Sequence, residues 1–260
     1  MTFSRLHLVD GTFELYRAHY SQRPYAPDKA TRGLEASIRW LIAEKAEQVT
    51  HLAVAFDNPI RSFRNDLFDG YKSDEGVPPE LRSQFDAAEA VVRALGVTVW
   101  SMKELEADDA IASAATKYSA DFEQIRILSP DKDFGQCLEG THVVMVDRIR
   151  KRVIDEAEMR ARRGVGPESI PDLLALTGDD ADGIPGLPGF GEKTASALLA
   201  RYVHIEAIPD DPSAWGPVRG ADKLADTLKK SRKELALYKR LATLVKDAPL
   251  AESVDDLRLK

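Results

Sequence analysis

Short apolar runs alternate with amphipathic segments through the first half of the chain. Apolar runs at residues 6–9, 51–56, 97–100, 124–128 and 142–146 predict strands, and residues 152–154 predict a further strand at a sheet edge. Helical spacing of apolar residues appears at 31–47, 80–95 and 107–118. Strands that alternate with helices predict a mainly parallel sheet flanked by helices, which is an α/β fold.

The pattern changes twice along the chain. Between Asn58 and Pro79 the periodicity fails, and aromatic residues mix with basic ones. From about Gly164 the chain becomes a series of short helices broken by Gly and Pro. We therefore expect a first unit at residues 1–160 and a helical unit at 161–260, packed together without a flexible linker.

Composition excludes several classes of protein. The chain has 260 residues, a net charge of −7 and one cysteine, so a disulfide framework and a thiolate zinc site are both excluded. Its apolar runs are all shorter than the ~20 residues that span a bilayer, and residues 1–5 lead directly into a strand without a signal-peptide core. We expect a cytoplasmic protein that does not enter the membrane. The negative charge argues only weakly against nucleic acid, because basic residues can cluster locally.

Acidic residues follow the ends of the predicted strands. Because ligands of parallel sheets bind beyond the carboxyl ends of the strands, these acids should share one edge of the sheet. They are Asp10, Asp57, Asp131 and Asp133. One acid after a strand is more often a turn or cap residue than a ligand. Four at one edge exceed what turns require.

A second acidic group, Glu106-Ala107-Asp108-Asp109, opens the helix predicted at 107–118. Acids in a first helical turn are favoured by the free N–H groups and the helix dipole, so helix capping and metal binding explain this group about equally well. Three neighbouring carboxylates repel one another unless a cation lies among them. The acids expected at the same sheet edge favour the metal site.

Clustered carboxylates without Cys or suitably spaced His predict a site for hard cations, Mg²⁺ or Mn²⁺. There are enough acids for two ions, which suits hydrolysis of phosphodiesters. A covalent phosphatase is the competing enzyme class, because Val9-Asp10-Gly11-Thr12 resembles the aspartyl-phosphatase loop. That loop needs a nucleophilic Asp two residues before Asp10, and this chain has Leu8 there.

Two further segments combine cations with rings or glycines. Arg61-Ser62-Phe63-Arg64 and Phe68-Asp69-Gly70-Tyr71-Lys72 offer cations for phosphates and rings for stacking, or rings that anchor a surface loop. Gly189-Phe190-Gly191-Glu192-Lys193-Thr194 is a turn that opens a helix, where backbone N–H groups and Lys193 could hold a duplex phosphate. Before it, Asp179 and Asp182 could join the metal cluster if the hairpin folds against the sheet edge.

Taken in order, these motifs resemble the 5′-nuclease family, which includes the 5′→3′ exonuclease domain of bacterial DNA polymerase I, the phage 5′ nucleases and the flap endonucleases. The resemblance covers nearly the whole chain. It rests on Leu8-Val9-Asp10-Gly11, Phe56-Asp57, Ser62-Phe63-Arg64, Gly70-Tyr71-Lys72, Glu106 to Asp109, Asp131-Lys132-Asp133 and Gly178 to Ala195. No polymerase domain follows, so we expect a stand-alone form.

The resemblance implies a PIN-like nuclease core with an arch at about 58–85, and a helix-3-turn-helix region of the helix-hairpin-helix type at 161–260. It implies a 5′→3′ DNA exonuclease or structure-specific 5′ flap endonuclease that uses two Mg²⁺ or Mn²⁺ ions and acts as a monomer on 5′ ends, flaps and nicked or branched duplexes. The implied metal ligands are Asp10, Asp57, Glu106, Asp108, Asp109, Asp131, Asp133, Asp179 and Asp182.

The resemblance also assigns residues that contact DNA. Arg64 and Lys72 would touch the scissile phosphate at the base of the arch, with Arg61 nearby and Tyr71 stacking on a base. Gly189, Gly191, Lys193 and Thr194 would form the duplex-binding hairpin, where the family can also hold K⁺ through backbone carbonyls.

The chain departs from the family pattern at two places. Polymerase-linked members read Ser-Asp-Asn where this chain has Ala181-Asp182-Gly183, and the arch after Lys72 is acidic. Two alternatives stay open: a structure-specific DNA-binding protein with little catalysis, and a related RNase.

Overall fold

The computed structural model describes residues 4–259. Of residues 1–5, which precede the first predicted strand, only Ser4 and Arg5 lie within the described part. It contains a six-stranded sheet with strand order β3-β2-β1-β4-β5-β6. Neighbouring strands are parallel except β5 and β6, which are antiparallel, and β6 lies at the sheet edge as predicted. The strands are β1 Arg5–Asp10, β2 His51–Asp57, β3 Thr98–Met102, β4 Gln124–Leu128, β5 Val143–Asp147 and β6 Arg152–Ile154.

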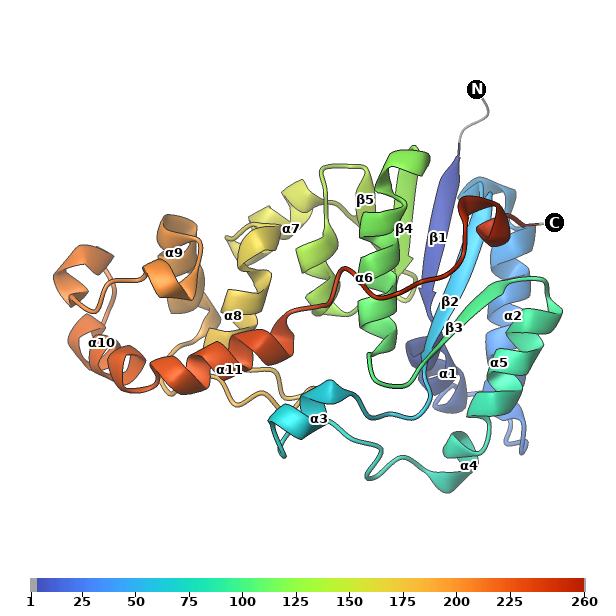
Figure 1. The fold of residues 1–260 in the computed structure, drawn as a ribbon, viewed down its shortest axis with the longest axis horizontal. Coiled ribbons are helices and arrows are strands. Elements are labelled where there is room, and N and C mark those ends of the chain that lie inside the picture. Colours follow the sequence, from blue (N-terminus) through green and yellow to red (C-terminus); the bar gives the residue numbers. More distant parts are fainter. Residues whose placement is uncertain (1–3, 260) are drawn as a thin grey trace.

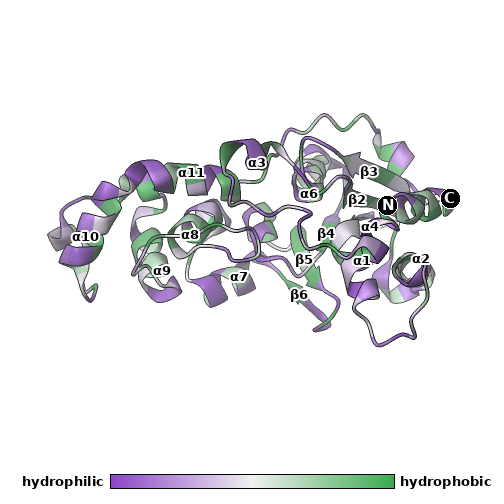
Figure 2. Ribbon diagram, turned by 90° about the horizontal axis from the view of Figure 1, so that it is seen from below, coloured by the Kyte–Doolittle hydropathy of each residue, from purple (hydrophilic) through white to green (hydrophobic). Residues whose placement is uncertain are grey.

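Helices cover both faces of the sheet because side chains alternate between the faces along each strand. Leu6 and Leu8 of β1 lie in the larger buried cluster with α6, whereas Val9 lies in a second cluster with α1, α2 and α5. Figure 2 shows the sheet between these two layers. The helices of this part are α1 Gly11–His19, α2 Lys29–Ala43, α3 Phe63–Leu67, α4 Pro79–Arg82, α5 Phe85–Ala94 and α6 Ala107–Lys117.

The second half is helical, as the sequence predicts. It extends to one side of the sheet in Figure 1, with α8 packed against α9 and α11. The larger buried cluster runs without a break from the sheet into these helices, so the two parts share one core. The helices are α7 Glu156–Arg163, α8 Ile170–Thr177, α9 Glu192–Tyr202, α10 Ala221–Lys230 and α11 Arg232–Ala242, with 3₁₀ turns at Pro167–Ser169, Ile205–Ala207 and Pro212–Trp215.

The C-terminal segment, residues 243–259, does not stay with the helical region. It leaves α11 and runs back along α6 to the far side of the sheet (Figure 1). Ser113 of α6 donates to the Val245 carbonyl, and the Leu259 N–H donates to the Thr50 carbonyl next to β2. The segment therefore ties the helical region to the sheet and its flanking helices.

Several element boundaries differ from the predictions. The helix predicted at 31–47 ends at Ala43 and continues as a 3₁₀ turn, and the helix predicted at 80–95 is divided into α4 and α5. The irregular segment 58–79 contains the short helix α3, which Ser62 and Asn65 cap reciprocally. Within residues 4–259, each helix is too short or too polar to cross a bilayer.

Candidate active site

Three strand ends bring carboxylates to one edge of the sheet. Asp10 is the last residue of β1 and Asp57 the last of β2, while Asp131 follows β4, the other neighbour of β1. The Asp10 carboxylate caps α1 by accepting from the Phe13 N–H at 2.8 Å, and its second oxygen accepts from the Ser129 hydroxyl at 3.1 Å. Asp10 is thus held by the turn into α1 and by the residue that follows β4.

The start of α6 lies at the same edge. The Ala107 N–H donates to the Asp57 carboxylate at 2.7 Å, which fixes the helix beside β2. Glu106 precedes the helix and forms an ion pair with Lys72 at 3.1 Å. Lys72 also contacts Asp182 at 2.9 Å, so one ammonium group bridges α6 and the loop after α8.

The loop after α8 folds against the arch and completes the cluster. Oxygen atoms of Asp133, Asp179 and Asp182 lie within 4.8 Å of one another. The Lys72 N–H donates to the Asp182 carbonyl at 3.0 Å, and Lys132 pairs with Asp179 at 2.8 Å.

Gly183 explains one departure from the family pattern. Its backbone has φ of +75°, which favours glycine, and a Cβ there would lie 2.0 Å from the carbonyl oxygen of Gly70. A glycine is therefore needed for this close approach of the loop to the arch. The approach supports Asp182 next to Lys72.

Crowding and burial perturb the protonation of this cluster. Burial, together with Asp57 and Asp131, raises the pKa of Asp10 to about 7. Burial and neighbouring carboxylates also raise the pKa values of Asp108 and Asp133 well above normal. Burial alone would raise the pKa of Glu106, but Lys72 and Arg64 outweigh it and hold that pKa below its usual value.

The donor set fits a hard divalent cation. Asp133 is buried, and its Oδ1 accepts no hydrogen bond from the described residues, which is costly unless another group approaches. The surrounding ligand atoms are carboxylate oxygens, the type that Mg²⁺ and Mn²⁺ prefer. Asp10, Asp57, Asp108, Asp131, Asp179 and Asp182 could complete one or more such sites with Asp133 and Glu106.

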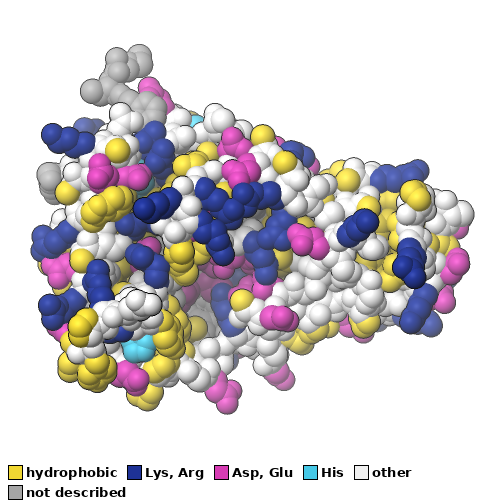
Figure 3. Space-filling model, turned by 180° about the vertical axis from the view of Figure 1, so that it is seen from behind, with side chains coloured by type: hydrophobic (Ala, Val, Ile, Leu, Met, Phe, Trp, Pro, Cys, Tyr) yellow, Lys and Arg dark blue, Asp and Glu magenta, His cyan; other side chains and the backbone are white. Residues whose placement is uncertain are grey.

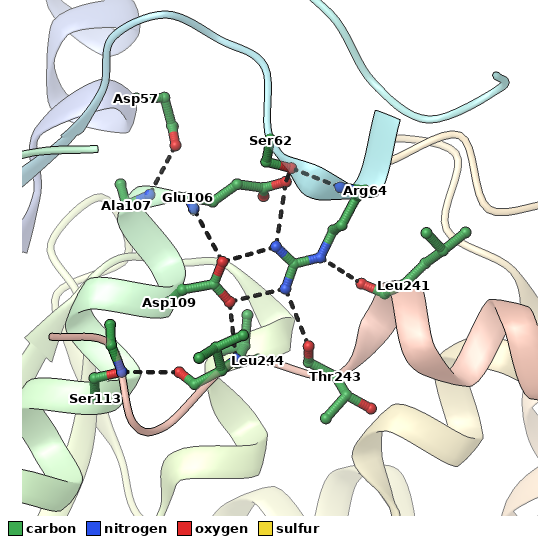
Figure 4. Close-up of polar contacts among 12 residues, drawn as sticks. Asp57, Ser62, Arg64, Glu106, Ala107, Asp109, Ser113, Leu241, Thr243 and Leu244 are labelled. Carbon is green, nitrogen blue, oxygen red and sulfur yellow. Dashed lines mark hydrogen bonds and ion pairs between the residues drawn. The ribbon is translucent and has the colours of Figure 1, made fainter. Parts of the chain in front are cut away.

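The structure does not support the roles predicted for Arg64, a phosphate contact, and Asp109, a metal ligand. Both are buried, and the Arg64 guanidinium holds the Asp109 carboxylate through two hydrogen bonds of 2.8 Å (Figure 4). Asp109 also accepts from the N–H groups of Glu106 and Val245. Asp109 therefore caps α6 and has no oxygen left for a metal ion.

The remaining Arg64 donors point away from the carboxylate cluster. Nε donates to the Leu241 carbonyl at 2.8 Å and Nη2 to the Thr243 carbonyl at 3.0 Å (Figure 4). The guanidinium is 1% exposed and cannot reach a phosphate without unfolding this junction. Its role is to join the arch, α6 and the end of α11.

The structure also contradicts the predicted stacking of Tyr71 on a base. Its ring is 5% exposed, and its hydroxyl donates to Glu106 at 3.2 Å, so it cannot offer a face for a base. Phe68 likewise packs against Tyr238, with 6.0 Å between the ring centroids. The rings of this segment mainly anchor it, as the alternative interpretation of the sequence proposed.

The other predicted DNA contacts lie on the surface. Arg61 is exposed and pairs with Asp66 near the entrance to the carboxylate cluster, where it lines a small pocket with Lys72 and Glu106. The second set lies at the start of α9, shortly after Asp182 along the chain. Gly191 caps α9, Gly189 has φ of +90°, Lys193 is exposed and the Thr194 N–H donates to the Gly191 carbonyl.

Sequence reasoning missed the residues that position the acids. Ser62 donates to Glu106 at 2.6 Å, Ser129 donates to Asp10, and Lys132 pairs with Asp179. Ser129 and Lys132 adjoin the predicted acids, and that proximity was the available signal. For Ser62 the signal was its N-cap position before a short helix.

Replacing Asp10 tests the electrostatic crowding. A folded pKa of about 7, above the ordinary 3.8, means that this group contributes stability at low pH that is lost as the pH rises through 7. Asn retains the cap of α1 without the charge. In EDTA, Asp10→Asn should therefore raise the melting temperature relative to wild type at pH 8 and much less at pH 5. An unchanged difference between the two pH values would refute this explanation, and Mg²⁺ should stabilise the wild type more than the variant.

Replacing Arg64 tests its structural role. Arg64→Met leaves the buried Asp109 carboxylate without its partner, which should cost about 3–5 kcal/mol in the free energy of unfolding measured with urea. Arg61→Ala is the control: its ion pair with Asp66 is exposed, so the cost should stay below about 1 kcal/mol. Equal effects of the two substitutions would show that Arg64 is not a structural centre.

Comparisons with known proteins identify the family. Residues 5–164 match the model of the 5′-3′ exonuclease N-terminal resolvase-like domain, and residues 165–260 match that of the 5′-3′ exonuclease C-terminal SAM fold. A protein of Aquifex aeolicus named 5′-3′ exonuclease is 30% identical over 98% of this chain and 86% of its own length. DNA polymerase I of Bacillus caldotenax is 34% identical over 97% of this chain, which spans 29% of that polymerase.

Solved structures share the fold. The T5 D15 protein co-crystallised with metal ions superposes with a TM-score of 0.74 at 20% identity, covering 93% of this chain and 90% of that one. The catalytic core of Rad2 in complex with a DNA substrate superposes with a TM-score of 0.61 at 14% identity, covering 96% and 80%. With both domain models matched in order along its length, the chain belongs to the 5′-3′ exonuclease family.

Proposed function

We propose that this chain is a divalent-metal-dependent nuclease that hydrolyses DNA phosphodiesters in the 5′→3′ direction and cleaves 5′ flaps. The observation that carries the proposal is the cluster of carboxylates from β1, β2, α6, the loop after β4 and the loop after α8, with an unpartnered buried oxygen on Asp133. The Aquifex relative is named 5′-3′ exonuclease, and a T5 D15 structure with the same fold is described as a flap endonuclease complex with DNA and metal ions.

Two Mg²⁺ or Mn²⁺ ions are the proposed cofactors. Bound there, they would supply an activated water and stabilise the charge that develops on the phosphate. Asp133, Asp179 and Asp182 would hold ions on the side of the α8 loop, and Asp10, Asp57, Glu106, Asp108 and Asp131 on the side of the sheet. This assignment leaves out Asp109, whose side chain is fully buried and whose oxygens accept from Arg64 and two backbone N–H groups. It keeps Glu106, which is held by side chains, among them the partly exposed Lys72.

Lys72 is the proposed catalytic residue of the arch. Burial alone would lower its pKa, but Glu106, Tyr71 and Asp182 raise that pKa well above its usual value, so the ammonium remains charged. Its backbone is held from both sides, by Asn65 on its carbonyl and by the Asp182 carbonyl on its N–H. A positioned cation beside the carboxylates can neutralise a phosphate oxygen as charge builds up.

The start of α9 is the proposed duplex contact. Gly191 leaves the first N–H groups of α9 accessible, and Lys193 adds a positive charge there. Such contacts hold a backbone phosphate and do not read sequence. We also propose a K⁺ ion on backbone carbonyls of this turn, a monomeric state, a cytoplasmic location, and the division into units 1–160 and 161–260.

Two substitutions in one loop test metal-dependent cleavage. Asp179→Asn removes a proposed ligand and should lower the rate of cleavage of a 5′-labelled flap in Mg²⁺ by about 10²-fold or more, the scale of losing one charge-stabilising group. Asp180→Asn changes the adjacent exposed carboxylate and should leave the rate near that of wild type.

The same assay separates the alternatives. EDTA should abolish cleavage, and full activity in EDTA would refute a metal mechanism. Binding of branched DNA in Ca²⁺ without any product in Mg²⁺ or Mn²⁺ would indicate a DNA-binding protein. Cleavage of only an RNA version of the strand would indicate an RNase.

Removing Lys193 tests the duplex contact. Lys193→Ala should weaken binding of nicked duplex to a similar extent for every sequence and reduce the slope of log affinity against log salt by about 1. Lys45→Ala is the matched control, because Lys45 precedes β2 and lies at the opposite end of the sheet from the carboxylates. If both variants have the same salt slope as wild type, Lys193 does not contact a phosphate.

A further inference from the structure

A basic groove lies beside α2 on the sheet face that α1 and α2 cover. It has a volume of about 510 Å³, and we name it the Trp40 groove. Lysines and arginines gather in the middle of this side of the molecule, as Figure 3 shows. The lining residues come from α1, α2, the 3₁₀ turn at Lys45–Glu47, β4 and the β5–β6 hairpin, and the cations among them are Arg17, Arg126, Arg148, Lys151 and Arg152.

The groove is separate from the carboxylate cluster. Arg17 lies seven residues beyond Asp10 along α1, which corresponds to ~10 Å of helix axis. The charge is also of opposite sign. Five cations line the groove with two acids, Glu47 and Asp147. Behind them, Glu14 pairs with Arg17 and Arg148, so five cations face three acids and the groove still favours anions, whereas the cluster favours cations.

The cations at the back of the groove are recessed. The side chains of Arg126 and Arg148 are 16% and 17% exposed, held by Glu47 and by Ser37 with Glu14. Burial, with Arg17 nearby, lowers the pKa of Arg148 despite Glu14. An anion entering the groove would offset this crowding of positive charge. A duplex lying across the surface would not reach guanidinium groups at this depth, whereas a terminal or free phosphate would.

An aromatic ring and an apolar side chain flank the cations. Trp40 is 49% exposed, and the Arg148 guanidinium lies 5.2 Å from its ring centroid. Val153 of β6, which also lines the groove, is 44% exposed. Rings and arginine planes are the groups on which nucleobases stack. The recessed cations are therefore suited to the phosphate of a nucleotide, and the ring beside them to its base.

We propose that the Trp40 groove binds a nucleotide that carries a phosphate monoester, with the phosphate on Arg126, Lys151 and Arg152 and the base against Trp40. A monoester is dianionic and can accept from several guanidinium groups at once, which favours it over a singly charged carboxylate. A free 5′-mononucleotide and the 5′-phosphorylated end of a strand both present this chemistry.

Tryptophan fluorescence tests the proposal directly. Trp100 and Trp215 are 5% and 3% exposed, so quenching by acrylamide reports mainly on Trp40. In EDTA, which prevents metal-bridged binding at the carboxylates, a deoxynucleoside 5′-monophosphate should protect the fluorescence with a saturable dependence on concentration. The nucleoside without phosphate should bind at least about tenfold more weakly, a loss equivalent to one good charged contact. Equal binding of nucleoside and nucleotide would overturn the proposal.

Charge reversals locate the phosphate. Lys151→Glu, in the exposed hairpin turn, should weaken the affinity for the nucleotide by about tenfold or more. Lys223→Glu makes the same charge change on α10, far from the groove, and should alter that affinity by less than about twofold. Trp40→Leu should weaken nucleotide binding, measured by calorimetry, more than it weakens binding of inorganic phosphate. Circular dichroism melts confirm that each variant is folded. Equal effects of Lys151→Glu and Lys223→Glu would overturn the proposal.

Three further ligands distinguish the source of the phosphate. Tighter binding of a 5′-phosphorylated single strand than of its 5′-hydroxyl form and of the mononucleotide supports a strand end, and tighter binding of the mononucleotide supports a free nucleotide. A glutamate-rich peptide that binds as tightly as either would overturn the phosphate assignment in favour of a protein partner. These are binding measurements without metal, so a negative result leaves the proposed cleavage reaction untouched.

Discussion

Mutual repulsion among carboxylates is the constraint to which most of the site is adjusted. Asp10, Asp57 and Asp131 end or follow neighbouring strands, and burial adds to their repulsion, as the raised pKa of Asp10 shows. Such a cluster is stable only with protons, internal cations or bound metal ions. The chain supplies internal cations: Lys72 contacts both Glu106 and Asp182, and Lys132 pairs with Asp179. The remaining negative charge is what suits the cluster to metal ions.

The first turn of α6 shows how one motif can serve two purposes. Asp109 points inward, where its oxygens accept from Arg64 and two N–H groups. Its charge therefore stabilises the junction between the arch and the end of α11. Asp108, one residue earlier, is half-buried, and its pKa is raised by burial and by Asp10, Asp131 and Asp57. Helix capping explained the motif as well as metal binding in the sequence. In the structure Asp109 has the capping role, and Asp108 is the residue left for the proposed metal site.

The sheet and its acidic edge could be predicted from sequence because they depend on local patterns. A short apolar run predicts a strand, and the carboxyl ends of parallel strands lie at one edge of the sheet. Arg64 and Tyr71 could not be placed in this way. Their surroundings are the Leu241 carbonyl and Glu106, which lie far away in sequence, and nothing in the sequence around them indicates burial. The return of residues 243–259 along α6 was unpredictable for the same reason, since an irregular segment has no period to read.

Segregation of charge decides how a chain with a net charge of −7 can meet a polyanion. The carboxylate edge repels phosphates in the metal-free state, so in the proposed function DNA would approach it after bound cations have offset the local charge. Lys193 and the start of α9 lie outside that edge, and in the proposed function they would hold a backbone phosphate whether or not metal is present. We therefore infer that duplex docking and metal loading are separable steps, and that the scissile phosphate enters the cluster only when both are complete. This order would confine hydrolysis to strands already held by the duplex contact, which is a physical basis for selecting structure over sequence.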